Sequence, residues 1–367
     1  MGTLVSAGAS LAGAAVFELS TGEKIAIYSN SSDSIVVYKD LDSTPALATS
    51  QTNTQIFGGT PQLYAVHACV DSADVIHVVA ACATSTRDTA YNTLTDVEGT
   101  PSWGTWEQVW DYSSTAFAHI PWASMTVAVD QNDVPHVIGI DTTKVHGSFY
   151  DQVVYSNRIG GTWSGPDVLS GTADETYRGA IQGLVVRDNN SAEALAYNFT
   201  LSDIVYWSRA SGSWGGESSY TGTFHGKALG VAQESGAGTI RRMHLSGINI
   251  YMNNADTTFD ASVTFENQLL PYIRNSDDVL YVLYFISTDG IGLLVYDGTW
   301  TDIGLLDNPT SESTVFTSWS YLIQNNDASM DYLYNDATDM YWNEYSFGGA
   351  VRIPRYGFTN FQVPGIV

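Results

Sequence analysis

A strand-like segment that ends in tyrosine recurs along the whole chain, and this repeat constrains the fold more than any other feature. Its seven copies end at Tyr38, Tyr91, Tyr155, Tyr206, Tyr251, Tyr296 and Tyr341. The last three intervals are all 45 residues, after earlier intervals of 53, 64 and 51 residues. We explain the longer early intervals by insertions, notably at 92–102 and 142–148. A near-constant period of this size indicates repeated supersecondary units rather than two unrelated domains.

A glycine followed two residues later by tryptophan forms a second marker after the tyrosine. It occurs at Gly104–Trp106, Gly161–Trp163, Gly212–Trp214 and Gly298–Trp300. In two copies the tryptophan lies eight residues after the tyrosine (Trp163 and Trp214). This pattern predicts a hairpin turn and then a strand whose large aromatic side chain packs against the next repeat.

Two more apolar segments, separated by a polar turn, precede each tyrosine. The clearest pairs are Leu63–Asp71 with Val75–Ala81, Met125–Asp130 with Pro135–Ile140, Leu184–Arg187 with Glu193–Tyr197, and Pro271–Asn275 with Val279–Ile286. The turns between them are rich in Asp, Asn and Ser, whose side chains hydrogen-bond to nearby backbone and tolerate left-handed conformations. Each unit is therefore expected to contain four antiparallel strands.

Seven four-stranded units predict an all-β fold, a seven-bladed β-propeller of four-stranded antiparallel blades. The seven units form one domain, 1–367, so no second domain is needed to account for the length of the chain. The expected blades are approximately 13–50, 62–115, 122–171, 180–222, 226–268, 269–314 and 315–356, followed by a C-terminal extension, 357–367. We expect Ala14–Ser20 to be the innermost strand of the first blade and Gly349–Tyr356 the outer strand of the last. A further strand at Thr3–Ala7 would latch the ring.

The charge balance excludes one class of partner. The chain has 14 Lys and Arg residues against 39 Asp and Glu, a net charge of −25. Nucleic-acid binding requires a basic surface, so no nucleic-acid partner is expected. Many of the acids fall in the hairpin turns, and no Asp-x-Asp-x-Asp-Gly metal loop is present. We therefore predict no cofactor and no dedicated metal site, with Ca²⁺ or Mg²⁺ bound only loosely by the acidic surface.

The first residues and the cysteines bear on the compartment. The segment 1–17 contains no Lys or Arg, whereas a secretory leader begins with a basic region, so no signal peptide is expected. No run of 18 apolar residues occurs, so no membrane insertion is expected. Cys69 and Cys82 fall on neighbouring predicted strands and are expected to be buried free thiols.

The repeat resembles a known family. Val127–Asp130 with Pro135–Val137, then Val153–Tyr155 and Gly161–Ser164, resembles the repeat of sialidase-like propellers that carry BNR-type repeats. This resemblance implies a family that includes sialidases, polysaccharide lyases, lectin-like binders and propellers of phage virion proteins. Sialidase chemistry is disfavoured, because only Asp297–Trp300 matches the end of an Asp box. The sialidase-like triplet Arg352–Pro354 also lies at the wrong end of the chain.

The favoured function is a non-enzymatic interaction module of a phage virion, on a tail fibre, tail tip or capsid. It would assemble in the host cytoplasm, form oligomers, and contact host-surface glycan or neighbouring virion proteins. The lack of a leader, the lack of a catalytic motif and the low lysine content motivate this hypothesis, and the repeats resemble phage adhesion propellers. Aromatic rings that stack on sugars are expected among Trp103, Trp106, Trp110, Tyr112 and Trp122. Packing beneath an elongated loop explains this cluster equally well.

The alternative is an enzyme, a polysaccharide lyase or related propeller acting on an acidic polysaccharide. His77, His136 and Tyr177 would then supply the acid and base, and Arg178 would neutralise the substrate carboxylate. His77 and His136 hold the same place in consecutive repeats, which favours a framework role, with a hydrogen bond to a turn carbonyl, over catalysis. A third hypothesis is a purely structural decoration protein that binds its coat or tail neighbours.

Overall fold

The computed structural model describes most of the repeats. It covers residues 14–30, 34–41, 43, 45–59, 63–82, 89–110, 125–145, 148–170, 181–188, 191–198, 201, 203–219, 229–233, 240–246, 249–252, 257–260, 269–273, 278–286, 290–307, 321–324, 329–335, 339–346 and 356–359. All structural statements below refer to these residues.

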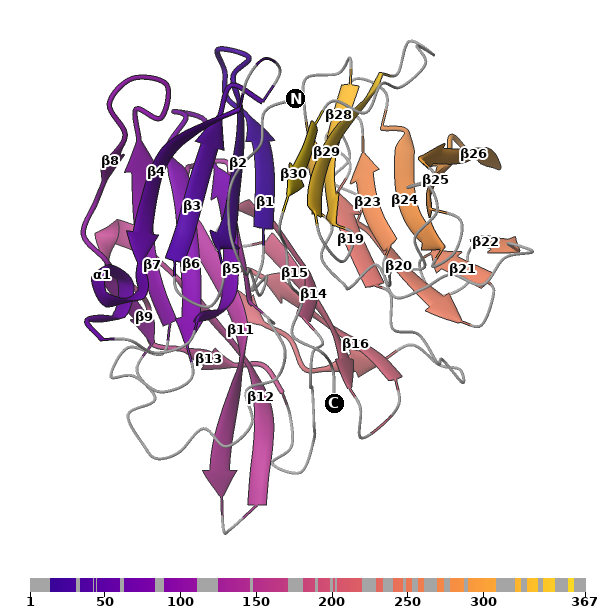
Figure 1. Ribbon diagram of the computed structural model, residues 1–367. Coiled ribbons are helices and arrows are strands. Elements are labelled where there is room, and N and C mark those ends of the chain that lie inside the picture. The colour runs from indigo at the N-terminus through magenta and orange to yellow at the C-terminus, as the bar shows by residue number, and fades with distance from the viewer. Residues whose placement is uncertain are drawn as a thin grey trace.

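Within them, seven antiparallel sheets follow one another along the chain (Figure 1). The first sheet contains β1 (Ala14–Glu18), β2 (Lys24–Asn30), β3 (Ser34–Lys39) and β4 (Ala46–Thr52). The second contains β5 (Leu63–Val70), β6 (Ile76–Cys82), β7 (Thr89–Thr95) and β8 (Ser102–Trp103), with β9 (Glu107–Trp110) also paired to β7. The third contains β10 (Met125–Val129), β11 (Pro135–Val145), β12 (Ser148–Asn157) and β13 (Asp167–Val168).

The remaining sheets follow the same plan. The fourth contains β14 (Ile181–Asp188), β15 (Ser191–Asn198), β16 (Asp203–Ala210) and β17 (Ser213–Trp214), with β18 (Ser218–Ser219) also on β16. The fifth contains β19 (Leu229–Gln233), β20 (Ile240–Ser246), β21 (Asn249–Met252) and β22 (Thr257–Asp260). The sixth contains β23 (Leu269–Ile273), β24 (Leu280–Ile286), β25 (Gly290–Tyr296) and β26 (Trp300–Asp307). The seventh contains β27 (Tyr321–Gln324), β28 (Ser329–Asn335), β29 (Asp339–Ser346) and β30 (Tyr356–Thr359).

The tyrosine repeat marks the same position in every sheet. Each repeat tyrosine lies on the third strand of its sheet, from Tyr38 on β3 to Tyr341 on β29. The predicted strand pairs upstream of the tyrosines are also confirmed, as in the register that places Val127 of β10 opposite Val137 of β11. The sequence period therefore reports a structural unit of four antiparallel strands.

The sheets contact one another through their first strands. β1 contacts β5, and the series continues through β10, β14, β19, β23 and β27. β27 in turn contacts β1, so the last sheet lies beside the first (Figure 1). This radial packing of all-β, antiparallel four-stranded sheets is the arrangement of a β-propeller.

The hydrophobic core lies between neighbouring sheets. Each sheet packs against a sheet on either side, so its central strands are buried on both faces. One cluster joins Ile25 and Ile35 of the first sheet to Val78 of the second. Another joins Val79 and Tyr91 of the second sheet to Val127 of the third. A further cluster continues from the third sheet to the fourth, with Tyr155 and Trp207. Burial between sheets explains why strands such as β3 and β6 are apolar on successive residues.

Several local expectations are adjusted by the structure. The outer strand of the last sheet is β30, Tyr356–Thr359, rather than 349–356, so it occupies the start of the expected C-terminal extension. A short helix, α1 (Asn53–Phe57), begins with a capping box formed by Thr52 and Gln55. Cys69 and Cys82 are free cysteines.

The proposed latch strand, Thr3–Ala7, lies outside the described residues. No helix among those described is both long and apolar enough to cross a membrane.

Candidate functional site

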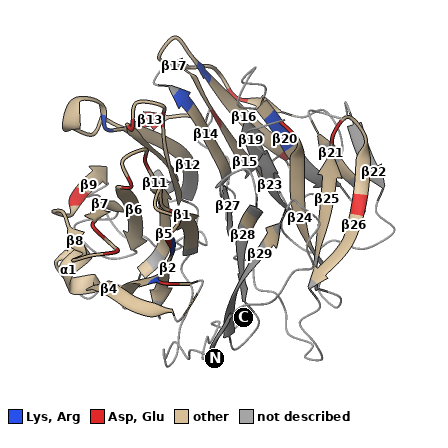
Figure 2. Ribbon diagram, turned by 90° about the horizontal axis from the view of Figure 1, so that it is seen from above, with Lys and Arg blue, Asp and Glu red and all other residues tan. Residues whose placement is uncertain are grey.

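The turns after the first and third strands of each sheet define one face of the molecule, which we call the turn face. Successive strands are antiparallel, so these turns lie at the same end of each sheet. Acidic residues lie in several of them (Figure 2). Within the described chain, non-glycine residues with positive φ are Asp40, Asp74, Asp96, Asp133, Ser211 and Asp278. Aspartate tolerates this left-handed conformation, which explains the Asp-rich turns as local folding features.

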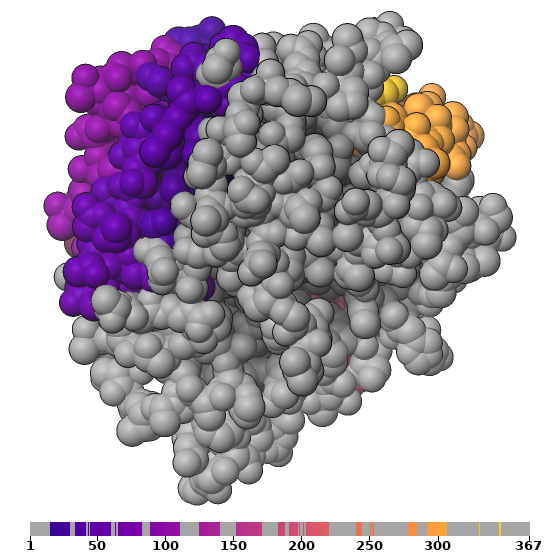
Figure 3. Space-filling view, in the orientation of Figure 1, coloured from indigo at the N-terminus to yellow at the C-terminus, as the bar shows by residue number. Residues whose placement is uncertain are grey.

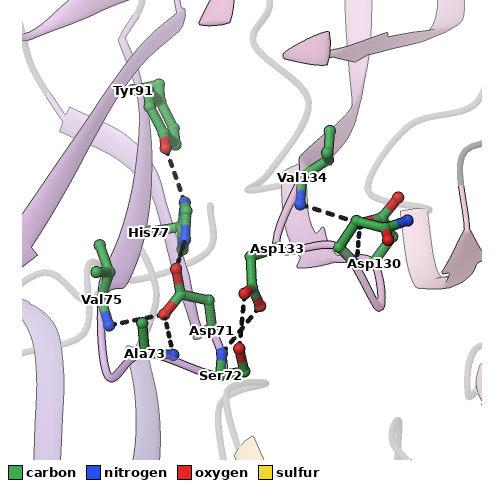
Figure 4. A network of polar contacts seen from close by, with 10 residues as sticks. Asp71, Ser72, Ala73, Val75, His77, Tyr91, Asp130, Asp133 and Val134 are labelled. Atoms are coloured by element: carbon green, nitrogen blue, oxygen red, sulfur yellow. Dashed lines mark hydrogen bonds and ion pairs between the residues drawn. The ribbon is translucent and has the colours of Figure 1, made fainter. Parts of the chain in front are cut away.

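Two turns on this face carry the same network of Asp, His and Tyr. Figure 4 shows the network of Asp71, His77 and Tyr91, together with the neighbouring turn at Asp130. Asp71 Oδ1 accepts hydrogen bonds from the amides of Ala73 (2.9 Å) and Val75 (2.8 Å). Asp71 Oδ2 lies 3.1 Å from His77 Nε2, and His77 Nδ1 lies 2.7 Å from the Tyr91 hydroxyl. The histidine therefore connects the turn of the second sheet to its repeat tyrosine.

The third sheet repeats this network. Asp130 Oδ1 accepts hydrogen bonds from the amides of Asn132 (2.8 Å) and Val134 (3.0 Å). His136 Nδ1 lies 2.5 Å from the Tyr155 hydroxyl, and His136 Nε2 lies 3.6 Å from Asp130 Oδ2. His136 is 0% exposed. Its ring is therefore out of reach of a substrate in this conformation.

Burial shifts the pKa of His77 and of both tyrosines. Desolvation lowers the pKa of His77, although the neighbouring Asp71 carboxylate acts in the opposite direction. Desolvation also raises the pKa of both Tyr91 and Tyr155. The tyrosines therefore stay protonated, and each histidine lies between a turn aspartate and its repeat tyrosine. The partners are a carboxylate and a tyrosine hydroxyl, not the turn carbonyl expected from the sequence. The other two lyase candidates, Tyr177 and Arg178, lie outside the described residues.

A second aspartate in each turn connects neighbouring sheets. Asp74 of the second sheet accepts a hydrogen bond from the Ser20 amide (2.8 Å) in the first sheet. Asp133 of the third sheet accepts hydrogen bonds from the Ser72 amide (3.0 Å) and hydroxyl (2.6 Å) in the second. These hydrogen bonds to Ser72 lower the pKa of Asp133. The Asp-x-x-Asp turns thus fold one hairpin and attach it to the preceding sheet.

The glycine–tryptophan markers also act between sheets. Trp163 packs edge-on against Tyr91, with ring centroids 4.9 Å apart, and Trp214 packs in the same way against Tyr155, also at 4.9 Å. These two tryptophans contact the preceding repeat, not the next repeat as expected, whereas Trp300 packs against Tyr296 of its own sheet at 5.1 Å. The spacing predicted that the tryptophan packs between repeats, but it did not predict whether the contact is with the preceding or the next repeat.

Arginines that the sequence analysis missed accompany these tryptophans. Arg158 lies over the Tyr91 ring at 5.7 Å and forms a bidentate ion pair with Glu107, at 2.9 and 2.7 Å. Arg209 lies over the Tyr155 ring at 5.2 Å. Each arginine follows its own repeat tyrosine by three residues, and this spacing is the signal that would have found them.

The tryptophans proposed as a sugar platform lie where the second sheet meets the first. Trp103 and Trp106 stack with centroids 5.7 Å apart. Their indole N–H groups donate to Thr49 Oγ1 (3.1 Å) and Gln51 Oε1 (3.2 Å) on β4. Trp106 and Trp110 are buried, whereas Trp103 is half-buried. Tyr112 and Trp122 lie outside the described residues. Of the three described tryptophans, Trp103 is the one with a ring partly accessible to a ligand.

A polar cavity of about 320 Å³ opens on the turn face at the same meeting of the first and second sheets. Its lining residues are Thr21, Gly22, Glu23, Lys39, Asp40 and Glu98. The segment 96–101 that carries Glu98 leads directly into Ser102–Trp103 of β8, so the cavity and Trp103 belong to one interface. The surfaces of these two sheets, indigo and purple, adjoin on one flank of the molecule (Figure 3).

Hydrogen bonds position the side chains around the cavity. Lys39 Nζ donates to the Glu98 carbonyl oxygen at 2.6 Å, and the Thr21 hydroxyl donates to the Glu98 carboxylate. The Asp40 amide donates to the Glu23 carboxylate. Carboxylate oxygens accept, and hydroxyl and ammonium groups donate, so the lining can hydrogen-bond a ligand with several hydroxyl groups. No motif in the sequence pointed to these residues, apart from the general gathering of acids in the turns.

Comparisons with known proteins identify the fold. No family model matches the chain, and no curated protein matches it. Among solved structures, a mutant of the Aleuria aurantia lectin in complex with Fucalpha1-6GlcNAc is similar, with a TM-score of 0.54 and 9% identity over 95% of both chains. A protein of unknown function from Dyadobacter fermentans gives a TM-score of 0.51 at 11% identity, covering 91% of this chain and 93% of that one.

A further similar structure is described as a fungal lectin with a six-bladed β-propeller fold. It gives a TM-score of 0.50 at 9% identity over 98% of both chains. At such identities the likeness shows the fold, a β-propeller. It does not identify a BNR-repeat protein or a phage protein. The described part of the present chain contains seven sheets, against the six blades named for that lectin.

Proposed function

We propose that this chain is a seven-bladed, glycan-binding β-propeller that binds sugar where its first and second blades meet. The observation that carries the proposal is the polar cavity of about 320 Å³ at the interface that also holds the half-buried Trp103. Sugar sites combine a ring face for the C–H surface with a few fixed hydrogen-bonding groups. The cavity lining supplies the polar groups, and Trp103, which does not line the cavity but follows Glu98 by five residues at the same interface, is proposed to supply the ring. The propeller lectins among the similar structures bind fucosides, which adds support from the fold.

The blade number rests on the contacts between sheets. Seven sheets occur among the described residues, each from one continuous stretch of chain, and β27 of the last contacts β1 of the first. A ring in which every sheet packs on two others needs no shared strand for closure. We therefore infer seven blades and one domain, with blade limits close to those expected from the sequence.

The lining of the cavity favours binding over lyase chemistry. Elimination from a uronic acid requires a cation for the carboxylate together with an acid and a base. Among the described residues, the lining contains one cation, Lys39, but no histidine, tyrosine or arginine, and three carboxylates that would repel an anionic polysaccharide. A non-enzymatic binding role therefore fits this site better.

A glycan array followed by titration calorimetry tests the proposal. The array identifies the sugar, and calorimetry compares wild type with Trp103→Leu. Loss of a stacking ring is expected to weaken binding about three- to tenfold. Trp300→Leu removes a half-buried tryptophan from the sixth sheet and is the matched control, expected to bind like wild type. A protein that binds nothing on the array, or a Trp103→Leu variant that is folded and binds normally, would contradict the proposal.

The finer hypothesis of a virion adhesion protein is a separate part of the proposal. It is supported by the sequence features alone, namely the repeat composition and the lack of a catalytic motif. Its partners would be host-surface glycan and neighbouring virion proteins. Neighbouring genes for tail or capsid proteins, and co-purification of the chain with assembled particles, are the expected results. A chain that is encoded far from such genes and is absent from particles would exclude this location.

A further inference from the structure

The hairpin of β11 and β12 is longer than the third sheet needs. β11 has 11 residues and β12 has 10, whereas the second and third strands of the other six sheets have four to eight. Its pairing runs without a register shift from His136 opposite Asn157 to Val145 opposite Ser148. Figure 1 shows the hairpin projecting beyond the other strands, at the end of the sheet away from the turn face. This projection contains the insertion at 142–148.

The outer part of this hairpin, which we call the ribbon, consists of Thr142–Val145 paired with Ser148–Asp151. Within the described chain, β10 pairs with β11 only as far as Gly139, and β13 pairs with β12 only at Val154 and Tyr155. Both edges of the ribbon are therefore open toward the described strands, with backbone N–H and C=O groups that another strand could pair. A two-stranded hairpin is at best marginally stable in water without further strands or a packing partner.

The charge of the ribbon distinguishes it from the rest of the chain. Between Thr142 and Asp151 the sequence has one cation, Lys144, and one anion, Asp151, whereas the whole chain has a net charge of −25. Two copies of such an acidic chain repel each other, and the repulsion is smallest where they meet through neutral segments. A basic partner would be attracted to the acidic turns and not to the ribbon. The charge therefore favours a second copy of this chain as the occupant of the ribbon.

The sequence also distinguishes the two edges. Lys144 lies on β11, and a lysine on an edge strand disfavours pairing with another strand. The open part of β12 contains no lysine and includes Phe149 and Tyr150, two residue types that favour strands. Pairing through β12 is therefore favoured over pairing through β11.

We propose that the ribbon is a dimerisation element, in which β12 of one copy pairs with β12 of a second copy. The product is one antiparallel sheet of four strands, in the order β11, β12, β12 and β11. A two-fold axis allows the same edge of each copy to satisfy the open backbone groups of the other. This inference goes beyond glycan binding and does not depend on it. Because the cavity lies on the turn face, a dimer joined at the opposite end leaves both cavities accessible.

Two variants remove the contact in different ways. In the first, an Asn-Gly turn replaces residues 142–151, so that Asp141 opposite Gln152 becomes the last pair of a shorter hairpin. The second, Tyr150→Lys, keeps the hairpin length and puts a lysine on the edge of β12. It makes the chain less acidic, so general charge repulsion cannot explain a loss of association. Leu305→Lys is the matched control, since Leu305 is 49% exposed on β26, an outer strand of the sixth sheet.

Sedimentation equilibrium measures the association. We expect the average mass of the wild type to rise with concentration from that of one chain, 39.7 kDa, toward twice that value. The Leu305→Lys variant should behave in the same way. Both ribbon variants should remain at the mass of one chain up to about 100 µM, a loss of at least tenfold in dimer affinity. Thermal unfolding checks that each variant is folded.

Hydrogen exchange locates the contact. In the wild type, the amides of the ribbon should exchange at least about threefold more slowly at high protein concentration than at low concentration. Three results would overturn the proposal. They are a wild type that stays monomeric up to about 100 µM, a dimer that persists in the shortened variant or in Tyr150→Lys, and a dimer whose ribbon amides exchange at the same rate at both concentrations.

Discussion

At the scale of single residues, Gly292 of the sixth sheet leaves no room for a side chain beside the ring of Tyr284. This glycine is opposite Tyr284 across the pair β24–β25, and a Cβ atom there would lie 2.1 Å from Cζ of the tyrosine ring. The Tyr284 hydroxyl also donates to Asp302 at 3.2 Å, which restrains the ring. We expect Gly292→Ala to lower the free energy of unfolding in urea by about 1–3 kcal/mol, since the ring must move.

Gly165 provides the control for this substitution. A Cβ atom at Gly165 meets nothing within 4 Å, so Gly165→Ala is expected to unfold like wild type. Equal stability of both variants would show that the Tyr284 ring shifts without cost.

Another residue-scale prediction concerns the buried histidine of the third sheet. His136→Phe keeps an aromatic ring but leaves the Tyr155 hydroxyl and the Asp130 carboxylate without their histidine contact. Loss of a buried polar partner is expected to lower the unfolding free energy by about 1–3 kcal/mol. Urea unfolding measures the loss, and calorimetry with the glycan found on the array should show unchanged affinity per folded molecule. A specific loss of activity or binding with normal stability would indicate a functional histidine instead.

The sequence predicted the equivalence of His77 and His136 but not their partners. Equal positions in two repeats are visible in a linear pattern, whereas the Asp71 contact forms only when the turn folds back on the strand. The same limit applies to the cavity. Glu23 and Glu98 come from different sheets, and no spacing along the chain brings them to one interface.

At the scale of elements, packing between sheets is carried by pairs of aromatic rings. Tyr91 with Trp163 and Tyr155 with Trp214 have nearly equal geometry, with interplanar angles of 77° and 75°. A double-mutant cycle on Tyr91→Leu and Trp163→Leu is expected to give a coupling free energy of about 0.5–1.5 kcal/mol. The pair Tyr155 and Trp214 should give a similar value. The mixed pair Tyr91 and Trp214 is the control, and a coupling there as large as in the two contacting pairs would contradict pairwise packing.

A histidine on β5 makes the contact between the second and third sheets sensitive to acid. The Val127 amide of β10 donates to His67 Nδ1 at 3.3 Å. Desolvation lowers the pKa of His67 to about 4. A histidine in the unfolded chain has a pKa of about 6.5. Between about pH 4 and 6.5, His67 is therefore protonated in the unfolded chain but not in the folded chain. Stability is full above pH ~6.5 and falls as the pH decreases toward ~4, by at most about 1.4 kcal/mol per pH unit from this group.

Urea unfolding at several pH values measures this effect. His67→Asn keeps an acceptor for the Val127 amide and removes the titrating ring, so its stability should decline less steeply between pH 6.5 and 4. Parallel pH profiles for the two proteins would exclude His67 as a source of the acid sensitivity.

Most strands were predictable because apolar segments alternate with Asp, Asn and Ser turns throughout the chain. The exceptions have physical causes. β30 has only four residues, Tyr356–Thr359, and the apolar segment before Pro354 is an equally strand-like candidate in the sequence. α1 has only five residues, too few to show a helical period, and it is specified by the capping box of Thr52 and Gln55.

At the scale of the whole molecule, the acidic composition and the repeat have one explanation. The aspartates of the turns fold hairpins and attach neighbouring sheets, as Asp74 does with Ser20 and Asp133 with Ser72. Because the repeats place these turns on one face, the same residues give that face its negative charge. The cavity that we propose as the binding site inherits its sign from this structural use of aspartate and glutamate.

Ring closure is the property that belongs only to the whole molecule. β1 contacts β5 on one side and β27 and β28 on the other, so the first sheet depends on the last. A chain that ends at residue 314 lacks the seventh sheet and leaves one side of β1 uncovered. We expect amide hydrogen exchange to show protection of β1 reduced at least tenfold, equivalent to about 1.4 kcal/mol of local stability. A chain that ends at residue 360 keeps β27–β30 and is the control. If β1 stays as protected without the seventh sheet as with it, the stability of the first sheet comes from its other contacts, and closure of the ring contributes nothing to it.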